Sequence, residues 1–176
     1  MPTLSGPHNT SSFKKGLWWK VLTSIVILAA LGFSIGKCSV DQNMSWYGHL
    51  NIPFYAPAPW LSKIMWAISY VLIGGSFGII WHIRTVKRYP IIKKFAKGSM
   101  IIFGIHLLFN YLHPVFLLKL EMPVVALIDI LILVGFILGL IKRFFRLDRI
   151  ASFLLVPYFL WVIYNLAVNI AIVVIN

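Results

Sequence analysis

The sequence predicts an all-α membrane protein built as a bundle of five transmembrane helices. Three observations lead to this prediction: 60% of the 176 residues are hydrophobic, only 11% are charged, and the apolar residues fall into long runs. A soluble domain carries about 25% charged residues, so this chain lacks the polar side chains that would cover a water-exposed surface.

The apolar runs are each long enough to cross a hydrocarbon core of about 30 Å, which takes about 20 helical residues. We predict helices over residues 17–36, 60–83, 98–118, 124–141 and 150–175. Residues 1–16 form a polar N-terminal tail, and residues 17–176 form one membrane domain. The first run could also be a cleaved signal peptide. We favour a retained helix, because the residues before Cys38 lack a small-x-small cleavage pattern.

The segments between the runs differ in character. Residues 37–59 are expected to form a loop, because Pro53, Pro57 and Pro59 each remove a backbone N–H donor. This loop is rich in tryptophan and tyrosine, so it is too apolar for a plain solvated linker. The second and fourth loops, residues 84–97 and 142–149, are strongly basic.

Lysine and arginine are distributed unevenly over the two sides of the predicted bundle. Of the 16 Lys and Arg residues, all but Lys37, Lys63 and Lys119 fall on the side that holds the tail and the two basic loops. For a bacterial inner membrane, the positive-inside rule places the N-terminus in the cytosol and the C-terminus outside. A basic nucleic-acid site also needs a polar surface to display it, so no nucleic-acid partner is expected.

Polar side chains inside the predicted spans are few, and each is a candidate functional residue because burial in lipid is costly. They are His106, Asn110, His113, Asp129, Asn165 and Asn169. Asp129 is the only acid in a span. It either joins helices by a hydrogen bond or handles a ligand or proton, and Asn110 presents the same alternatives.

Metal and cofactor chemistry find little support in the sequence. His106 and His113 share one helix face about 10 Å apart, which is too far for both to ligate one haem iron axially. The motifs of hydrolysis, phosphoryl transfer and metal catalysis are absent from the sequence, and Cys38 is the only cysteine. We therefore predict no metal site and no required cofactor.

Aromatic and small residues indicate a binding surface and packing seams. Trp66 and Trp161 lie well inside their spans, where they would make a flat apolar wall that suits a planar aromatic ligand. Three pairs have the Gly-x-x-x-Gly spacing that lets helices approach closely. These pairs are Gly32 with Gly36, Gly74 with Gly78, and Gly135 with Gly139. They serve internal packing or a homodimer.

Several motifs fall in order along the chain and resemble those of the TspO/MBR family (tryptophan-rich sensory protein, translocator protein, peripheral benzodiazepine receptor). The first comprises Trp46, Tyr47, Leu50, Pro53, Pro57, Trp60, Trp66, Tyr70 and Gly74. Phe109-Asn110, Ala126-Leu127-Ile128-Asp129 and the segment Leu154 to Trp161 follow in the later spans. The resemblance covers about Trp46 to Asn176.

This resemblance implies a five-helix bundle with an internal ligand cavity, over which the proline- and aromatic-rich first loop folds as a lid. It also implies binding of porphyrins, sterols or benzodiazepine-type ligands, with porphyrin as a ligand rather than a cofactor. The ligand-binding candidates that it indicates are Trp46, Tyr47, Leu50, Pro53, Trp66, Asn110, Asp129, Trp161 and Asn165. No catalytic residue is firmly indicated, although Trp66 and Trp161 would serve a light-dependent breakdown of porphyrin.

Three features of the sequence differ from the family pattern and affect which class of ligand is expected. Asn165 stands where a small residue is usual, His113 stands where a tryptophan is usual, and no basic residue follows Arg149 to complete a C-terminal sterol consensus. Tetrapyrrole binding is therefore better supported than sterol binding. The leading hypothesis is a membrane receptor or sensor. The alternatives are a transporter of such ligands, a photochemical enzyme, and a protein whose basic loops hold anionic lipid or an acidic partner.

Overall fold

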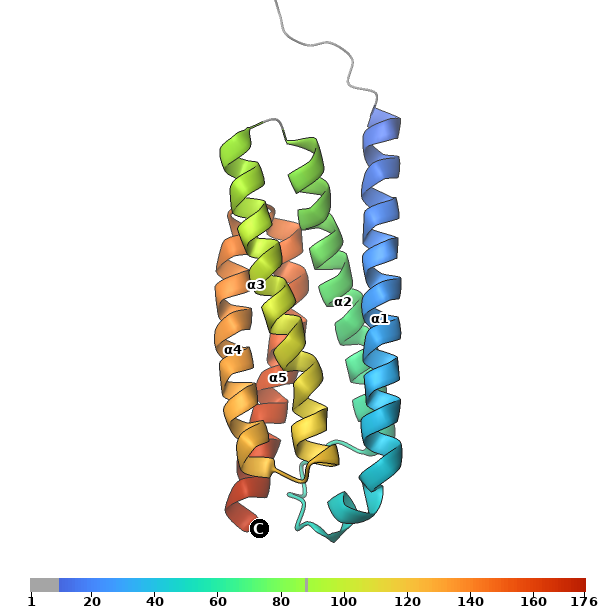
Figure 1. Ribbon diagram of the computed structural model, residues 1–176, viewed down its shortest axis with the longest axis vertical. Coiled ribbons are helices and arrows are strands. Elements are labelled where there is room, and N and C mark those ends of the chain that lie inside the picture. Colours follow the sequence, from blue (N-terminus) through green and yellow to red (C-terminus); the bar gives the residue numbers. More distant parts are fainter. Residues whose placement is uncertain (1–9, 88) are drawn as a thin grey trace, which may run out of the picture.

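The computed structural model describes the backbone of residues 10–87 and 89–176, and the side chains of this part except at residues 10–15, 36 and 38–45. It is a bundle of helices α1 (Thr10–His49), α2 (Pro59–Val86), α3 (Pro90–Pro114), α4 (Pro123–Phe145) and α5 (Arg149–Ile175) (Figure 1). A short π-helix, η1 (Val115–Lys119), continues α3.

Five segments of these helices are long and apolar enough to cross a membrane. In α1 that segment is Gly16–Ile35, while in the others it covers the whole helix, together with η1 for α3. The chain is therefore a multi-pass membrane protein, as predicted. Residues 1–9 of the predicted polar tail lie outside the described residues.

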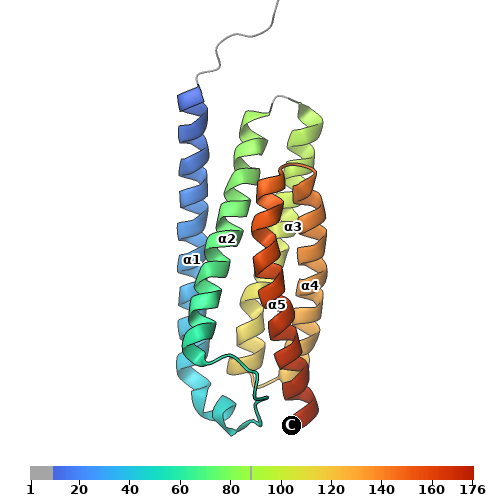
Figure 2. The same ribbon diagram turned by 180° about the vertical axis from the view of Figure 1, so that it is seen from behind.

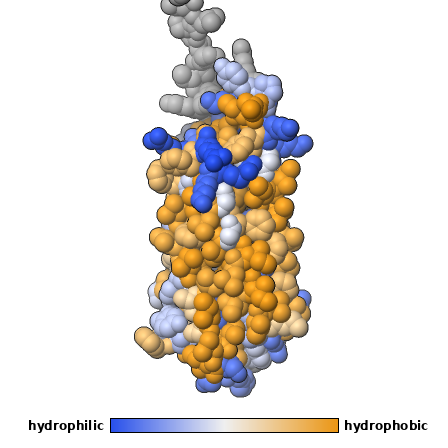
Figure 3. Space-filling view, turned by 90° about the vertical axis from the view of Figure 1, so that its left-hand side faces the viewer, coloured by the Kyte–Doolittle hydropathy of each residue, from blue (hydrophilic) through white to orange (hydrophobic). Residues whose placement is uncertain are grey.

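The helices are arranged around one apolar core. Helix α1 flanks α2 on one side of the bundle and α4 lies on the other, with α3 and α5 between them on opposite faces (Figures 1 and 2). Ile73 of α2, Phe103 of α3, Leu133 of α4 and Leu155 of α5 are all almost fully buried in this core. The face seen in Figure 3 is a broad apolar belt with hydrophilic side chains toward both ends. One end of the bundle carries the basic residues Arg84, Lys93, Lys94 and Lys97. This end, where α2 meets α3, is called the basic end.

Local sequence signals explain where the helices start. Pro59, Pro90 and Pro123 are the first residues of α2, α3 and α4. Proline suits this position because its missing N–H would have no partner in the first turn. Helix α5 starts differently: the Asp148 carboxylate accepts a hydrogen bond of 2.9 Å from the backbone N–H of Ala151, which caps the helix.

Helices α1 and α3 extend furthest beyond the predicted spans, and α4 also continues to Phe145, so the loop predicted from residue 142 is helical in its first part. Helix α1 runs from Thr10 to His49, so the predicted tail to residue 16 and loop from residue 37 were wrong for these helical parts. The first proline after the span is Pro53, and no earlier residue forbids a helix. Helix α3 begins at Pro90, which places Lys93 and Lys97 on its first turns and not in a loop. Hydropathy marks where a helix leaves the hydrocarbon, and these helices continue past that point.

The predicted glycine seams have different roles. A Cβ on Gly74 would lie 2.7 Å from the Cα of Ile25, and one on Gly78 would lie 2.5 Å from the Cα of Val21. This seam therefore lets the backbones of α1 and α2 touch. Gly32 lies under the ring of Tyr70, which a Cβ would overlap, while the surroundings of Gly36 fall outside the described part of the chain. Gly135 and Gly139 face open space, with no atom within 4 Å of an added Cβ.

The close contact between the α1 and α2 backbones leads to a prediction about the stability of the fold. Gly78→Ala should destabilise the protein by about 1–3 kcal/mol, because the new methyl group meets backbone that cannot move without displacing α1. Thermal unfolding in detergent measures this. Gly104→Ala is the matched control, since no atom lies within 4 Å of that Cβ. The control should match the wild type or gain up to about 1 kcal/mol from helix propensity. Equal unfolding temperatures for Gly78→Ala and the wild type would contradict the close contact.

Candidate ligand-binding site

The loop between α1 and α2 (residues 50–58) closes the end of the bundle opposite the basic end, beside the last turns of α5 (Figures 1 and 2). Side chains of α5 hold it there. Asn51 donates its backbone N–H to the Asn176 side-chain oxygen at 2.8 Å, and Asn176 Nδ2 donates to the Asn51 carbonyl at 3.1 Å. The Tyr164 hydroxyl donates to the Tyr55 carbonyl, and the Tyr55 hydroxyl donates to the Ala167 carbonyl at 3.4 Å. The loop is thus fastened to α5 at two points.

The predicted lid residues lie at this end of the bundle. Trp46 and Tyr47 occupy the last turn of α1, and Leu50 follows it; all three are half-buried. Pro53, within the loop, is buried. Burial raises the pKa of the Tyr47 phenol, so this group stays protonated and can donate a hydrogen bond.

A row of aromatic rings crosses the bundle below the loop. The ring centroids of Trp66 and Trp161 are 6.4 Å apart in a T-shaped arrangement, which joins α2 to α5. On one side Trp66 contacts Tyr70 at 6.1 Å, and Tyr70 contacts Tyr111 of α3 at 5.9 Å. On the other side Trp161 stacks on Tyr164 at 5.3 Å. The row ends at the tyrosine that binds the loop, so the predicted tryptophans and the lid are physically connected.

A hydrogen-bonded polar group lies deeper in the bundle, centred on Tyr158. Asn110 Nδ2 donates to the Tyr158 hydroxyl oxygen at 2.8 Å, and His106 Nε2 lies 3.0 Å from the same oxygen. The Tyr70 hydroxyl donates to Asn110 Oδ1 at 3.5 Å. Tyr158, His106 and Asn110 are essentially inaccessible to solvent. The Asn110 side chain therefore mainly holds α3 against α5. Of the two roles that the sequence leaves open for Asn110, this is the one of joining helices by a hydrogen bond.

A second polar group is buried but poorly satisfied. His113 Nδ1 of α3 and Asp129 Oδ2 of α4 are 3.5 Å apart. Neither carboxylate oxygen of Asp129 has a hydrogen-bond partner among the described residues, and the same holds for the Trp161 indole N–H and the Asn169 amide. Buried polar groups without partners are rare and costly. Ser24 and His106 also carry such atoms, but those of Asp129, Trp161 and Asn169 lie in the loop-facing half of the bundle, and they mark this region as a candidate site.

One predicted site residue, Asn165, remains to be placed, and three polar residues of the site region were not predicted. Asn165 Nδ2 donates to the carbonyl of Trp161, one turn earlier on α5, at 2.7 Å, so its amide is partly bound to its own helix. Tyr158, His106 and Asn169 were not among the predicted site residues. The polar positions in the spans indicated the last two, while Tyr158 carries no charge that would distinguish it within an apolar run. In the part of the chain described, no three His, Cys, Asp or Glu side chains are grouped to hold a metal ion.

Comparison with known proteins shows that the chain is similar to the members of one protein family. The model of the TspO/MBR family matches residues 24–175. The tryptophan-rich protein TspO of Archaeoglobus fulgidus is 29% identical over 159 residues, which cover 89% of this chain and 97% of that protein. The tryptophan-rich sensory protein of Cereibacter sphaeroides is 24% identical, covering 78% and 80%. The human translocator protein is 21% identical, covering 86% and 87%.

Proposed function

The chain belongs to the TspO/MBR family, and from this membership and the geometry of the site we propose that it is a membrane receptor or sensor for a planar hydrophobic ligand. The ligand class is a porphyrin or related tetrapyrrole, which would bind inside the bundle under the α1–α2 loop. The names of the relatives, a sensory protein and a translocator protein, agree with a receptor role.

One observation carries the proposal: two of the unsatisfied polar groups, those of Trp161 and Asn169, lie on α5, the helix that also supplies Trp161 and Tyr164 to the aromatic row. Trp161 belongs to both sets, because its ring contacts Trp66 and its buried N–H has no partner among the described residues. A tetrapyrrole offers a flat π-surface together with ring nitrogens and acidic side arms. It would stack on Trp66 and Trp161, while its acidic side arms would accept hydrogen bonds from the Asn169 amide and the Trp161 indole N–H.

Other ligands match these groups less completely. A sterol is rigid and apolar, but it has no π-surface and carries a single hydroxyl, so it would leave most of the buried polar atoms without partners. A benzodiazepine-type molecule has fused aromatic rings but few polar atoms. The tetrapyrrole is favoured because it provides both kinds of contact.

Binding requires movement of the loop and the two tryptophans. Trp66 and Trp161 contact one another in this structure, so a flat ligand must separate them or lie against the edge of the pair. The loop is fastened by four hydrogen bonds, each of which contributes about 1 kcal/mol net. A fastening of this strength can open and close, as a lid over a site must.

Transport and photochemical breakdown of the ligand would use the same site. Flux of protoporphyrin into proteoliposomes would indicate transport. Loss of pigment on illumination that depends on Trp66 or Trp161 would indicate photochemistry, and pigment loss that is unchanged in both variants would exclude these residues from it.

Protoporphyrin IX binding tests the proposed function. Trp66→Phe and Trp161→Phe should each weaken binding by about 3- to 10-fold, because a smaller ring loses roughly 0.5–1.5 kcal/mol of aromatic contact. Quenching of the remaining tryptophan fluorescence in detergent measures the affinity. Trp18→Phe and Trp19→Phe are matched controls, since these rings are 63% and 73% exposed on α1. Equal losses in the controls, or no saturable binding by the folded wild type, would contradict the proposed site.

The orientation in the membrane is a further part of the proposal. We place the N-terminus and the basic end in the cytosol, because 13 of the 16 Lys and Arg residues belong to this side. The single cysteine, Cys38, would then lie toward the outside. A membrane-impermeant thiol reagent should label it in right-side-out vesicles. Labelling only after the vesicles are inverted would reverse the orientation.

A homodimer through α4 is the proposed assembly. Gly135 and Gly139 border a groove of about 390 Å³ that is also lined by Ile102, Ile132 and Phe136. Unlike Gly74 and Gly78, these glycines have no atom of another described helix within 4 Å of an added Cβ, so a second copy could pack there. Gly139→Leu should reduce the dimer fraction measured by cross-linking in vesicles, while Gly104→Leu should not. An undiminished dimer in Gly139→Leu would rule out this seam.

A further inference from the structure

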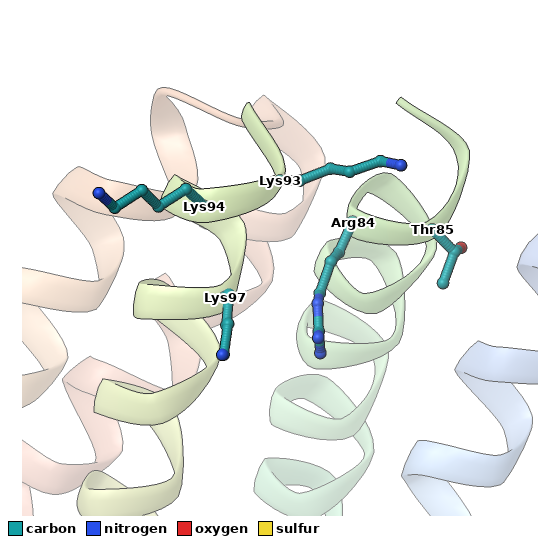
Figure 4. Close-up of a pocket in the computed structure, with 5 residues that line it drawn as sticks. All are labelled: Arg84, Thr85, Lys93, Lys94 and Lys97. Atoms are coloured by element: carbon teal, nitrogen blue, oxygen red, sulfur yellow. The ribbon is translucent and has the colours of Figure 1, made fainter. Parts of the chain in front are cut away.

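A second hollow lies at the basic end, far from the proposed ligand site. It has a volume of about 610 Å³ and lies between the end of α2 and the start of α3 (Figure 4). Its lining residues are Arg84, Thr85, Lys93, Lys94 and Lys97. Arg84 and Lys97 project from facing helices into the space between them, and Lys93 reaches across toward α2, while Lys94 points to the far side of α3 (Figure 4). Three cationic groups therefore surround one space.

A fourth cation is attached to this group through Thr85. Lys20 of α1 donates from its Nζ to the Thr85 hydroxyl oxygen, and that hydroxyl in turn donates to the His82 carbonyl at 2.8 Å. Lys20 Nζ also lies 5.9 Å from the centre of the Trp81 ring. Lys20 is thus held by specific contacts beside Thr85, next to the hollow without lining it, and adds positive charge to the same end of the bundle.

No carboxylate of the described residues lines the hollow to balance this charge. The chain has four acidic residues, Asp41, Glu121, Asp129 and Asp148, and the side chains of the last three are described. Glu121 and Asp129 lie at and near the α4 start, toward the opposite end. Asp148 is at the same end, but its carboxylate caps α5 through Ala151. The cations must therefore repel one another unless an external anion lies between them.

The start of α3 adds to the positive potential. The N-terminus of a helix carries a partial positive charge that normally attracts acidic residues. The first turn of α3 has none, its N-cap residue Tyr89 makes no side-chain capping bond, and lysines occupy positions 93 and 94. Placing cations at this pole costs stability in the free protein, and an anion bound beside them removes the cost.

We propose that this hollow binds the phosphate of an anionic phospholipid headgroup. A phosphate suits the arrangement because Arg84 can contact two of its oxygens with the guanidinium fork while the lysines act as point charges. A lipid source is favoured because hydrophilic side chains at this end directly border the apolar surface (Figure 3), and lipid headgroups meet a membrane protein at such a border. A soluble phosphate ester shares the chemistry and is separated by the experiment.

The test measures binding of short-chain phosphatidylglycerol to the full-length protein in detergent, with phosphatidylcholine as the neutral comparison. The wild type should prefer phosphatidylglycerol. Arg84→Gln combined with Lys97→Gln should weaken this binding roughly 25-fold, since each cation at a membrane surface contributes about a factor of five. Lys142→Gln combined with Arg146→Gln is the control, because it removes the same charge from the same end without touching the hollow. It should stay within about twofold of the wild type.

Two further measurements make each outcome decisive. Lys97→Arg keeps the charge and should keep the binding, which separates loss of charge from loss of structure. Glycerol 3-phosphate should bind much more weakly than phosphatidylglycerol. Equal binding of the two would assign the hollow to a soluble phosphate and overturn the lipid source. Equal losses in the test and control pairs, or no preference over phosphatidylcholine, would overturn the site itself.

Discussion

The constraint on which this bundle depends is that a polar group surrounded by hydrocarbon needs a partner inside the protein. The backbone meets it by forming helices throughout the spans. Among the side chains, Tyr158 meets it most completely, because its hydroxyl lies 2.8 Å from Asn110 Nδ2 and 3.0 Å from His106 Nε2. This contact holds α5 against α3. It thereby also positions Trp161, which follows one turn later on α5.

In the half of the bundle near the α1–α2 loop, several buried polar groups lack such a partner. Asp129, Asn169 and the Trp161 indole keep buried polar atoms without a hydrogen-bond partner among the described residues, and Asp129 has only the 3.5 Å contact with His113. Each such group costs about 1–3 kcal/mol. The Tyr158 group and the apolar core must supply the stability that this half of the bundle lacks. A ligand that offers partners to these atoms would recover that energy on binding, which gives the proposed pocket affinity without a preformed metal or cofactor.

The sequence was sufficient for the fold because a membrane leaves few alternatives. Five apolar runs could only be helices, and Pro59, Pro90 and Pro123 began three of them. The extension of α1 to His49 was missed because hydropathy reports depth in the membrane and not helicity. Asn110 and Asp129 were found from their polarity, while Tyr158 resembled an ordinary apolar position. The contact of Asn51 with Asn176 joins residues 125 positions apart, which no local pattern could indicate.

The two proposed sites occupy opposite ends of α2 and share no residue. Trp66 and Arg84 are 18 positions apart, which corresponds to about 27 Å along the helix. Substitutions this far apart normally have additive effects, so each end can be altered without disturbing the other. A measurable coupling would require α2 to move as a rigid body. The contacts of Gly74 with Ile25 and of Gly78 with Val21 oppose such a movement, because α2 could slide only by carrying α1 with it. The geometry therefore favours two independent binding events, one toward each end of the bundle.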